Sequence, residues 1–302
     1  MPVRIQHNPR ARRVDARTLA AFKRLELLAH TVVEGFVTGL HTSPFKGFAI
    51  EFDEHRPYVP GDDLKHLDWK ILARKDRMYI KQYEEDTSLR AHVVLDTSGS
   101  MGYASQTFSK LDFGRFIVGT LAYLLLNQQD AVGLTTCSDQ LDLYLPPRST
   151  RRHYKRLLEG LDSLEPRNGT GLAETLHQLA VRLKRRALIV IVSDLFDDPD
   201  RICLALNHFA HRRHETILFN VLDRRELTFD FDAPTRFEDM EGDHRQAVDP
   251  KPLRRAYLKA FERHRNTIRS TCHNRRIDYQ EMVTDEPFAR RMAQYLIQRL
   301  KR

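Results

Sequence analysis

The feature that most constrains this chain is an apolar strand followed directly by a loop of oxygen-bearing side chains. Residues 93–95, Val-Val-Leu, read as a buried strand, and Asp96, Ser98 and Ser100 follow it at alternate positions. Carboxylate and hydroxyl oxygens gathered at a strand end are the ligands that a hard divalent cation needs. Asp, Ser and Gly also form ordinary turns, so the motif alone leaves a simple turn as the alternative.

The rest of the chain alternates apolar strands with amphipathic helices. The run 187–192, Ala-Leu-Ile-Val-Ile-Val, is continuously apolar, as a central strand covered on both faces should be. Strands that alternate with helices imply right-handed crossovers, and therefore an α/β fold with a doubly wound, mainly parallel sheet and helices on both faces. We expect strands at residues 91–96, 131–136, 140–145, 187–192, 215–222 and 277–283, and helices at residues 108–128, 150–164, 171–184, 199–213, 251–273 and 287–300.

Two shorter parts precede the main domain, which we assign to residues 89–302 with a hairpin insertion near residues 226–249. Residues 1–44 read as a basic arm followed by a helix over residues 18–33, and residues 45–88 read as a small strand-rich unit. An indole buries a large apolar area, so we expect Trp69 to anchor the core of this unit. A neighbouring polar cluster either supports turns and hydrogen bonds that hold the unit onto the main sheet, or forms a docking surface or a second metal site: Asp62, Asp63, His66 and Asp68.

The composition and charge of the chain bear on its partner, its relation to a membrane and its cellular compartment. Lys and Arg number 49 against 41 Asp and Glu, and the resulting charge of +8 favours an anionic partner only weakly. No apolar stretch reaches the roughly 20 residues of a membrane helix, so we expect no membrane span. Three widely separated cysteines suit a reducing compartment, and we predict a cytoplasmic protein. The basic arm, Arg4 to Arg17, leaves nucleic-acid binding as a less favoured alternative.

Two further oxygen-rich loops accompany the first. Thr170 precedes the helix expected at residues 171–184, and Asp194 directly follows the most apolar strand. In a doubly wound sheet the functional crevice lies at the carboxyl ends of the strands, where such loops converge. Each loop alone reads as an ordinary turn or helix cap. Together they predict one shared metal site with the ligands Asp96, Ser98, Ser100, Thr170 and Asp194.

These five residues resemble the metal-ion-dependent adhesion site of von Willebrand factor A-like domains. A longer pattern looks like the signature of one bacterial branch of such proteins, catalogued as domain of unknown function 58. It consists of Arg56-Pro57-Tyr58-Val59-Pro60-Gly61-Asp62-Asp63, His66-Leu67-Asp68-Trp69-Lys70, Tyr79-Ile80-Lys81 and Glu84-Glu85.

The resemblance implies a bound Mg²⁺, or Mn²⁺ in its place. It assigns hydroxyl ligands to Ser98, Ser100 and Thr170, and it has Asp96 and Asp194 act partly through water. A sixth position is left for a carboxylate from a partner protein. The resemblance also implies a MoxR-type AAA+ ATPase as partner, in the assembly or activation of other protein complexes.

The chemistry of the predicted site favours binding over catalysis. Two carboxylates and three neutral hydroxyls leave a divalent cation under-neutralised, so it attracts an acidic ligand oxygen. We therefore expect a non-enzymatic, metal-dependent protein-interaction module. The alternative is a metal-dependent phosphoesterase or nuclease with Asp197 or Asp198 as its base, although capping the helix near Pro199 is the simpler role for both. The sequence contains no P-loop, so any ATPase is a separate protein.

Overall fold

The main body of the computed structural model is a six-stranded sheet with the strand order β10-β7-β6-β3-β4-β5. β5 runs antiparallel to β4, and every other neighbouring pair is parallel. The strands are β3 (Arg90–Asp96), β4 (Ala131–Cys137), β5 (Leu141–Arg148), β6 (Leu188–Ser193), β7 (Glu215–Leu222) and β10 (Asp278–Val283). The structure describes residues 29, 32–33, 49–59, 69–75, 78–86, 89–167, 169, 171–231, 235–238 and 245–300.

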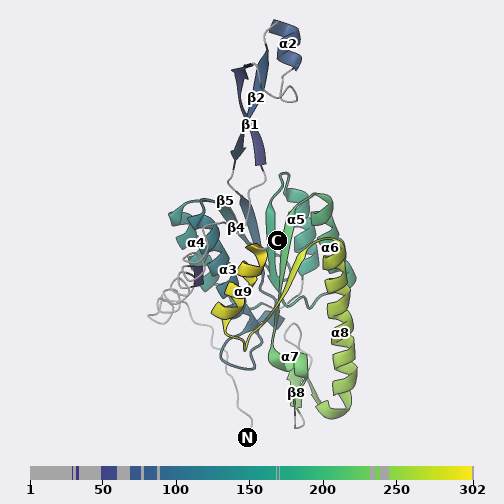
Figure 1. Cartoon of the computed structure of the whole chain (residues 1–302). Coiled ribbons are helices and arrows are strands. Elements are labelled where there is room, and N and C mark those ends of the chain that lie inside the picture. The colour runs from purple at the N-terminus through teal and green to yellow at the C-terminus, as the bar shows by residue number, and fades with distance from the viewer. Residues whose placement is uncertain are drawn as a thin grey trace.

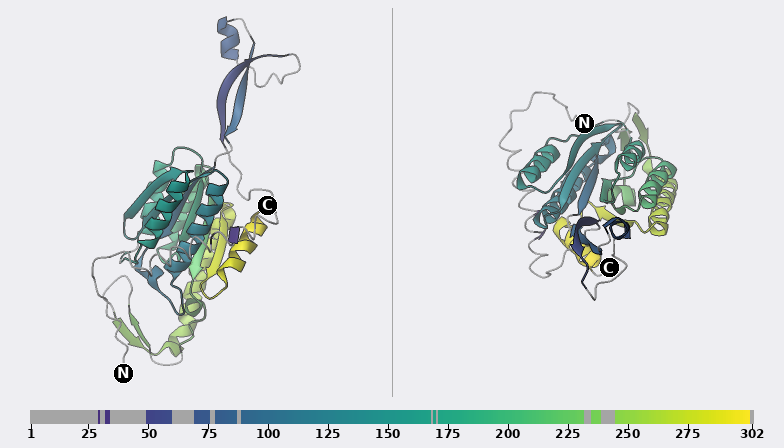
Figure 2. Two further views of the ribbon diagram at one scale, coloured as in Figure 1. Left: turned by 90° about the vertical axis from the view of Figure 1, so that its left-hand side faces the viewer. Right: turned by 90° about the horizontal axis from the view of Figure 1, so that it is seen from above.

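Helices cover both faces of this sheet (Figures 1 and 2). The predicted α/β fold with a doubly wound, mainly parallel sheet is therefore confirmed. One face carries α3 (Lys110–Asn127), α4 (Arg151–Asp162) and α9 (Phe288–Leu300). The other face carries α5 (Leu172–Arg182), α6 (Pro199–His211) and α8 (Pro250–Asn274).

The central strand β3 divides its side chains between two cores. Val93 and Leu95 pack in the cluster formed with α3, α4 and α9, whereas Val94 packs in the cluster formed with α5, α6 and α8. Successive side chains of a strand point to opposite faces, so an unbroken apolar run is what a strand with two covered faces requires. Both faces of β3 and β6 are therefore buried. Polar side chains that could bind a ligand are found instead at the ends of these strands.

Short elements lie at the carboxyl ends of the strands. The 3₁₀-helix η2 (Gly99–Gly102) follows β3, and α7 (Arg224–Thr228) follows β7. The insertion expected near residues 226–249 contains the antiparallel pair β8 (Thr235–Glu238) and β9 (Arg245–Val248). The five-residue α7 was not predicted, because its start depends on a capping box between Asp223 and Glu226 that a helical period does not reveal.

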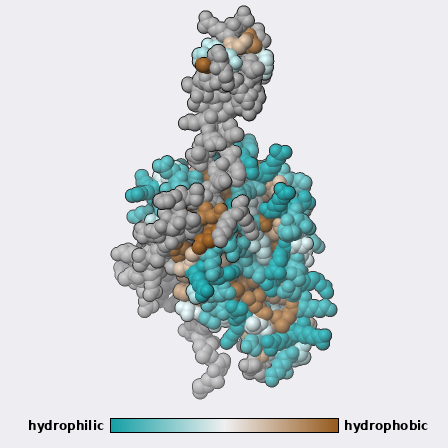
Figure 3. Space-filling model, in the orientation of Figure 1, coloured by the Kyte–Doolittle hydropathy of each residue, from teal (hydrophilic) through white to brown (hydrophobic). Residues whose placement is uncertain are grey.

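The strand-rich unit forms a separate two-stranded antiparallel sheet of β1 (Ala49–Pro57) and β2 (Tyr79–Asp86). Between them lies the helix α2 (Trp69–Lys75), and the hairpin extends away from the six-stranded sheet (Figures 1 and 2). The expectation that Trp69 anchors a core is wrong, because its side chain is 64% exposed. A two-stranded sheet has no second layer to cover an indole. Figure 3 shows apolar surface at the free end of this hairpin.

Some expectations fall on residues outside the described ranges. These are the basic arm, most of the helix at residues 18–33, and the polar cluster at residues 62–68. The described residues of that helix, Ala29, Val32 and Val33, are helical and buried. Within the described ranges, no helix combines the length and the apolar character that crossing a membrane requires.

The exposure of Trp69 predicts that its truncation has little effect on stability. We expect Trp69→Ala to change the free energy of unfolding by less than about 0.5 kcal/mol, because an exposed side chain loses no packing. Phe219→Ala, at a fully buried core position, serves as the control and should cost about 3–5 kcal/mol. Urea unfolding measures both values, and a loss in Trp69→Ala as large as that of the control contradicts the prediction.

Candidate metal centre

Two carboxylates meet at the carboxyl edge of the sheet. Asp96 ends β3 and Asp194 follows β6, and these two strands are paired neighbours. Both residues are 3% exposed. The hydroxyl Oγ of Ser193 donates to Oδ2 of Asp96 at 2.6 Å, which joins the ends of the two strands directly. The structure thus brings together Asp96 and Asp194, as the sequence predicted.

The serines of the first loop lie beside the same carboxylate. The backbone N–H of Ser98 donates to Oδ1 of Asp96 at 2.9 Å, which turns the chain back over the strand end. The hydroxyl oxygens of Ser98 and Ser100 are 3.1 Å apart and share a hydrogen bond. Alternate positions in this loop therefore place two hydroxyls side by side next to Asp96.

Thr170, the fifth predicted ligand, lies outside the described residues, but residues on either side of it contact the first loop and the loop after β4. Arg167 forms a β-bridge with Ser98 and donates its N–H to the Thr97 carbonyl at 2.8 Å. On the other side, the N–H of Gly171 donates to the Ser138 carbonyl at 2.7 Å. A Cβ on Gly171 would lie 2.3 Å from the Asp139 carbonyl oxygen, so only glycine allows this close approach.

The donor set fits a hard divalent cation. Burial and the charge of Asp194 raise the pKa of Asp96 to about 7, against the opposing hydrogen bonds from Ser193 and Ser98. The two carboxylates thus repel each other in a site that excludes water, and a cation between them relieves that repulsion. Among the described residues no three His, Cys, Asp or Glu side chains cluster as metal ligands. The oxygen donors beside Asp96 include the hydroxyls of Ser98 and Ser100, which are of the type that a hard cation accepts.

A buried lysine that the sequence analysis missed lies against the site. Lys110, the first residue of α3, is fully buried, and its Nζ donates to Oδ2 of Asp194 at 2.7 Å and to Oε1 of Glu226 at 2.5 Å. The ammonium also lies 4.8 Å from the centre of the Phe196 ring. Burial alone lowers the pKa of Lys110, but the carboxylates of Asp194 and Glu226 outweigh it and raise the pKa, so the group is charged.

This lysine connects the loop after β6, which carries Asp194, to the element that follows β7. The second oxygen of Glu226 accepts the N–H of Asp223 at 2.9 Å, which is part of the capping box that starts α7. Lys110 is separated from its two partners by 84 and 116 residues. A single lysine at a helix start usually lies in solvent. Only its contacts with residues distant in the sequence identify Lys110 as part of this site.

The two candidate bases of the hydrolase alternative are engaged at helix starts. Oδ2 of Asp197 accepts the N–H of Ala173 in the first turn of α5 at 3.1 Å. Asp198 is the N-cap of α6 and accepts the N–H of Asp200 at 2.9 Å. The predicted capping role is confirmed for Asp198, whereas Asp197 binds the start of a different helix. Both contacts tie the loop after β6 to the starts of α5 and α6.

Comparisons with known sequences place the chain among proteins without an assigned activity. The family model described as "Protein of unknown function DUF58" matches residues 54–267. Uncharacterized proteins of Mycobacterium bovis and Mycobacterium tuberculosis are 27% identical to this chain over 263 residues, which cover 85% of this chain and 82% of theirs.

Two solved structures align with about 70% of this chain. The conserved hypothetical protein BatB from Bacteroides thetaiotaomicron aligns with a TM-score of 0.49 and 16% identity, covering 71% of this chain and 100% of that one. The VWA domain of SpRpn10 aligns with a TM-score of 0.40 and 10% identity, covering 70% of this chain and 94% of that domain.

The buried ion pairs of Lys110 predict a large effect on stability. We expect Lys110→Met to lower the free energy of unfolding by about 3–5 kcal/mol, because it leaves the carboxylates of Asp194 and Glu226 buried without a cation. The matched control is Arg224→Met, which breaks the ion pair between Arg224 and Asp285 at 2.8 Å. The side chain of Arg224 is 43% exposed, so this variant should lose at most about 1 kcal/mol of unfolding free energy. Equal losses in the two variants, measured by denaturant unfolding, would contradict this prediction.

Proposed function

Because the chain belongs to the DUF58 family, whose description assigns no activity, we propose its function from the site: it is a Mg²⁺-dependent protein-interaction module. The observation that carries the proposal is the convergence of Asp96, Ser98 and Ser100 beside Asp194 at one edge of the sheet. Oxygen atoms at the ends of β3 and β6 would supply part of a coordination shell before any partner arrives.

Each residue has a defined part in this proposal. Asp96 and Asp194 supply negative charge to the ion, and Ser98 and Ser100 supply neutral hydroxyl oxygens. Thr170 is proposed as the third hydroxyl ligand. The ion, Mg²⁺ or Mn²⁺, supplies a positive centre with a position for an acidic oxygen of the partner. Lys110 holds Oδ2 of Asp194, and Oδ1 accepts the N–H of Phe196 at 3.3 Å. A carboxylate oxygen has more than one lone pair, so Oδ1 would face the ion or its water with its remaining lone pair.

Binding is better supported than hydrolysis. Hydrolysis requires a positioned base near the metal. The nearest carboxylates in sequence, Asp197 and Asp198, accept backbone N–H groups at the starts of α5 and α6. A carboxylate committed to a helix start is poorly placed to take a proton from water. We therefore propose a non-enzymatic role.

The partner is proposed to be a MoxR-type AAA+ ATPase of the cytoplasm that presents an acidic residue to the ion. The sequence pattern between Arg56 and Glu85 suggests this partner. Together the two proteins would act in the assembly or activation of other protein complexes. The absence of a P-loop in this chain agrees with ATP hydrolysis by a separate subunit.

Loss of the two serine hydroxyls should weaken metal binding without disturbing buried charges. We expect Ser98→Ala/Ser100→Ala to bind Mg²⁺ and Mn²⁺ at least about tenfold more weakly, equivalent to about 1.4 kcal/mol. Ser149→Ala/Ser163→Ala, which removes two exposed serine hydroxyls, is the matched control. Titration calorimetry with MgCl₂ or MnCl₂ measures the affinities, and unchanged affinity in the first variant removes the assigned ligands.

The partner interaction should depend on the same hydroxyls. The purified MoxR-type ATPase is mixed with immobilised wild-type protein in Mg²⁺ and with immobilised wild-type protein in EDTA. A third sample contains the immobilised Ser98→Ala/Ser100→Ala variant in Mg²⁺. We expect retention only by the wild type in Mg²⁺. Retention in all three samples would show that the ion does not mediate the contact. Asp194→Ala is a less informative variant, because it leaves the buried Lys110 with Glu226 as its remaining carboxylate partner.

A further inference from the structure

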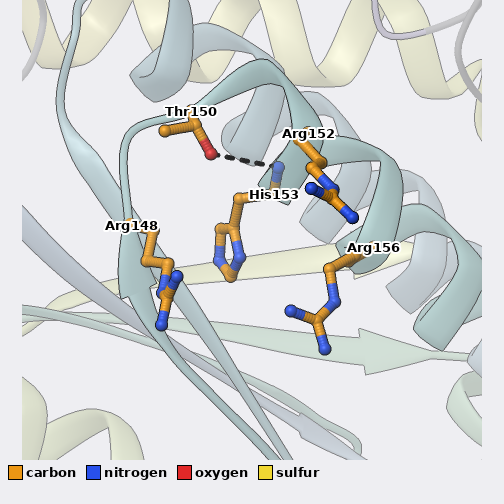
Figure 4. A pocket seen from close by; sticks show the side chains of 5 residues that line it. All are labelled: Arg148, Thr150, Arg152, His153 and Arg156. Carbon is orange, nitrogen blue, oxygen red and sulfur yellow. Dashed lines mark hydrogen bonds between the residues drawn. The ribbon is translucent and has the colours of Figure 1, made fainter.

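Two adjoining basic cavities lie at the start of α4, away from the metal centre. The smaller has a volume of about 240 Å³ and is lined by Arg148, Thr150, Arg152, His153 and Arg156 (Figure 4). The larger has a volume of about 470 Å³ and is lined by Arg152, Lys155, Arg156 and Glu159. The shared arginines Arg152 and Arg156 connect the two cavities into one basic surface.

The cavities lie at the opposite edge of the sheet from the metal centre. Arg148 ends β5 and pairs with Val132 near the start of β4, whereas Asp96 pairs with Cys137 at its end. The antiparallel direction of β5 carries the chain from the carboxyl edge of the sheet to its amino edge. A ligand at these arginines is therefore independent of the ion proposed at Asp96.

The charge at this helix start is opposite to the usual pattern. The amino end of a helix carries a partial positive charge and favours acidic side chains in its first turn. α4 has no acidic residue in its first turn and instead begins with Arg151 and Arg152, followed one turn later by Lys155 and Arg156. Thr150 caps the helix by accepting the N–H of His153. Cations placed against a positive helix end destabilise the free protein, and a bound anion would offset that cost.

The cations of the cavities are not neutralised by the rest of the described chain. Arg148, Arg152, Lys155 and Arg156 form no ion pair with any described residue, and all four are exposed. Figure 4 shows Arg148 on one side of the His153 ring and Arg152 and Arg156 on the other. His153 is engaged with the Val132 carbonyl through Nε2 at 2.8 Å. Burial lowers the pKa of His153, and the charges of Arg148 and Arg156 lower it further, so this residue adds no positive charge near neutral pH.

We propose that these cavities bind a small anion with two linked phosphate groups, such as pyrophosphate or the phosphate chain of a nucleotide. Arginine presents planar N–H pairs that match phosphate oxygens, and three arginines from a strand end and one helix face converge here. Four cations and the single carboxylate Glu159 line the two cavities, a net charge of +3 that suits a diphosphate better than one phosphate group. The two adjoining volumes give each phosphate its own space.

The test uses pyrophosphate as the probe in EDTA, so that no ion at the metal centre contributes. Titration calorimetry compares the wild type with Arg152→Gln/Arg156→Gln. We expect at least about tenfold weaker binding in this variant, because charged hydrogen bonds to both phosphates are lost. The control is Arg255→Gln/Arg263→Gln, which removes two exposed arginines of α8 and should bind as the wild type does. Ser98→Ala/Ser100→Ala should also bind pyrophosphate normally, which separates this site from the proposed metal centre.

Thermal unfolding without ligand provides a second readout. Arg152→Gln/Arg156→Gln should unfold at the same temperature as the wild type or above it, because like charges at a positive helix end have been removed. Pyrophosphate should raise the unfolding temperature of the wild type and not that of the variant. ATP in place of pyrophosphate distinguishes the source: equal affinity assigns the inorganic ion, and tighter binding assigns a nucleotide. Three results would each overturn the proposal. The first is equal pyrophosphate affinity in the wild type and the variant, and the second is a lowered unfolding temperature of the unliganded variant. The third is binding of a single-stranded oligonucleotide by a wild-type protein that does not bind pyrophosphate.

Discussion

The ion pair between Lys110 and Asp194 is the interaction on which the carboxyl edge of the sheet depends. Both side chains are almost completely removed from water. Removing Lys110 would leave Asp194 as a buried charge without its cation, whereas removing Asp194 would leave Lys110 with Glu226 alone. Through Lys110 the pair reaches Glu226 and the capping box of α7. The loop after β6, the start of α3 and the element after β7 are therefore held by one cation.

This arrangement also bears on the proposed chemistry. Asp194 has one oxygen committed to an ammonium, while Asp96 has its oxygens committed to Ser193 and to the backbone of Ser98. Hydrogen bonds of this kind fix the orientation of a metal-binding carboxylate before the metal arrives. The opposite edge of the sheet has the opposite electrostatic character, with arginines around His153 that form no ion pair with any described residue. A doubly wound sheet with an antiparallel edge strand separates the two regions, so the two proposed ligands would bind at opposite edges of the sheet.

Most of the main domain could be predicted from its sequence. The runs around residues 93–95 and 187–192 identify buried strands because both faces of such a strand must be apolar, and the helices between them follow from their period. The small unit was predicted less well. Its strands were recognised, but α2 and the exposure of Trp69 were not, because whether a large side chain is buried depends on a second layer of structure that local patterns do not describe.

The loops that carry the proposed metal ligands could be recognised from residue type and spacing alone. Alternate oxygen atoms after a strand place Ser98 and Ser100 on one side of a tight turn, and the position of Asp194 follows from the strand before it. The surroundings of those loops were decided by tertiary contacts alone. Lys110, Glu226 and Ser193 belong to the site because segments distant in sequence meet at one sheet edge. The same holds for Arg148 and Arg156, which line one cavity. They lie close together because the antiparallel strand β5 ends with Arg148 beside the start of α4, the helix that contains Arg156. Residue type and spacing define a loop, but only the packed chain defines which charges surround it.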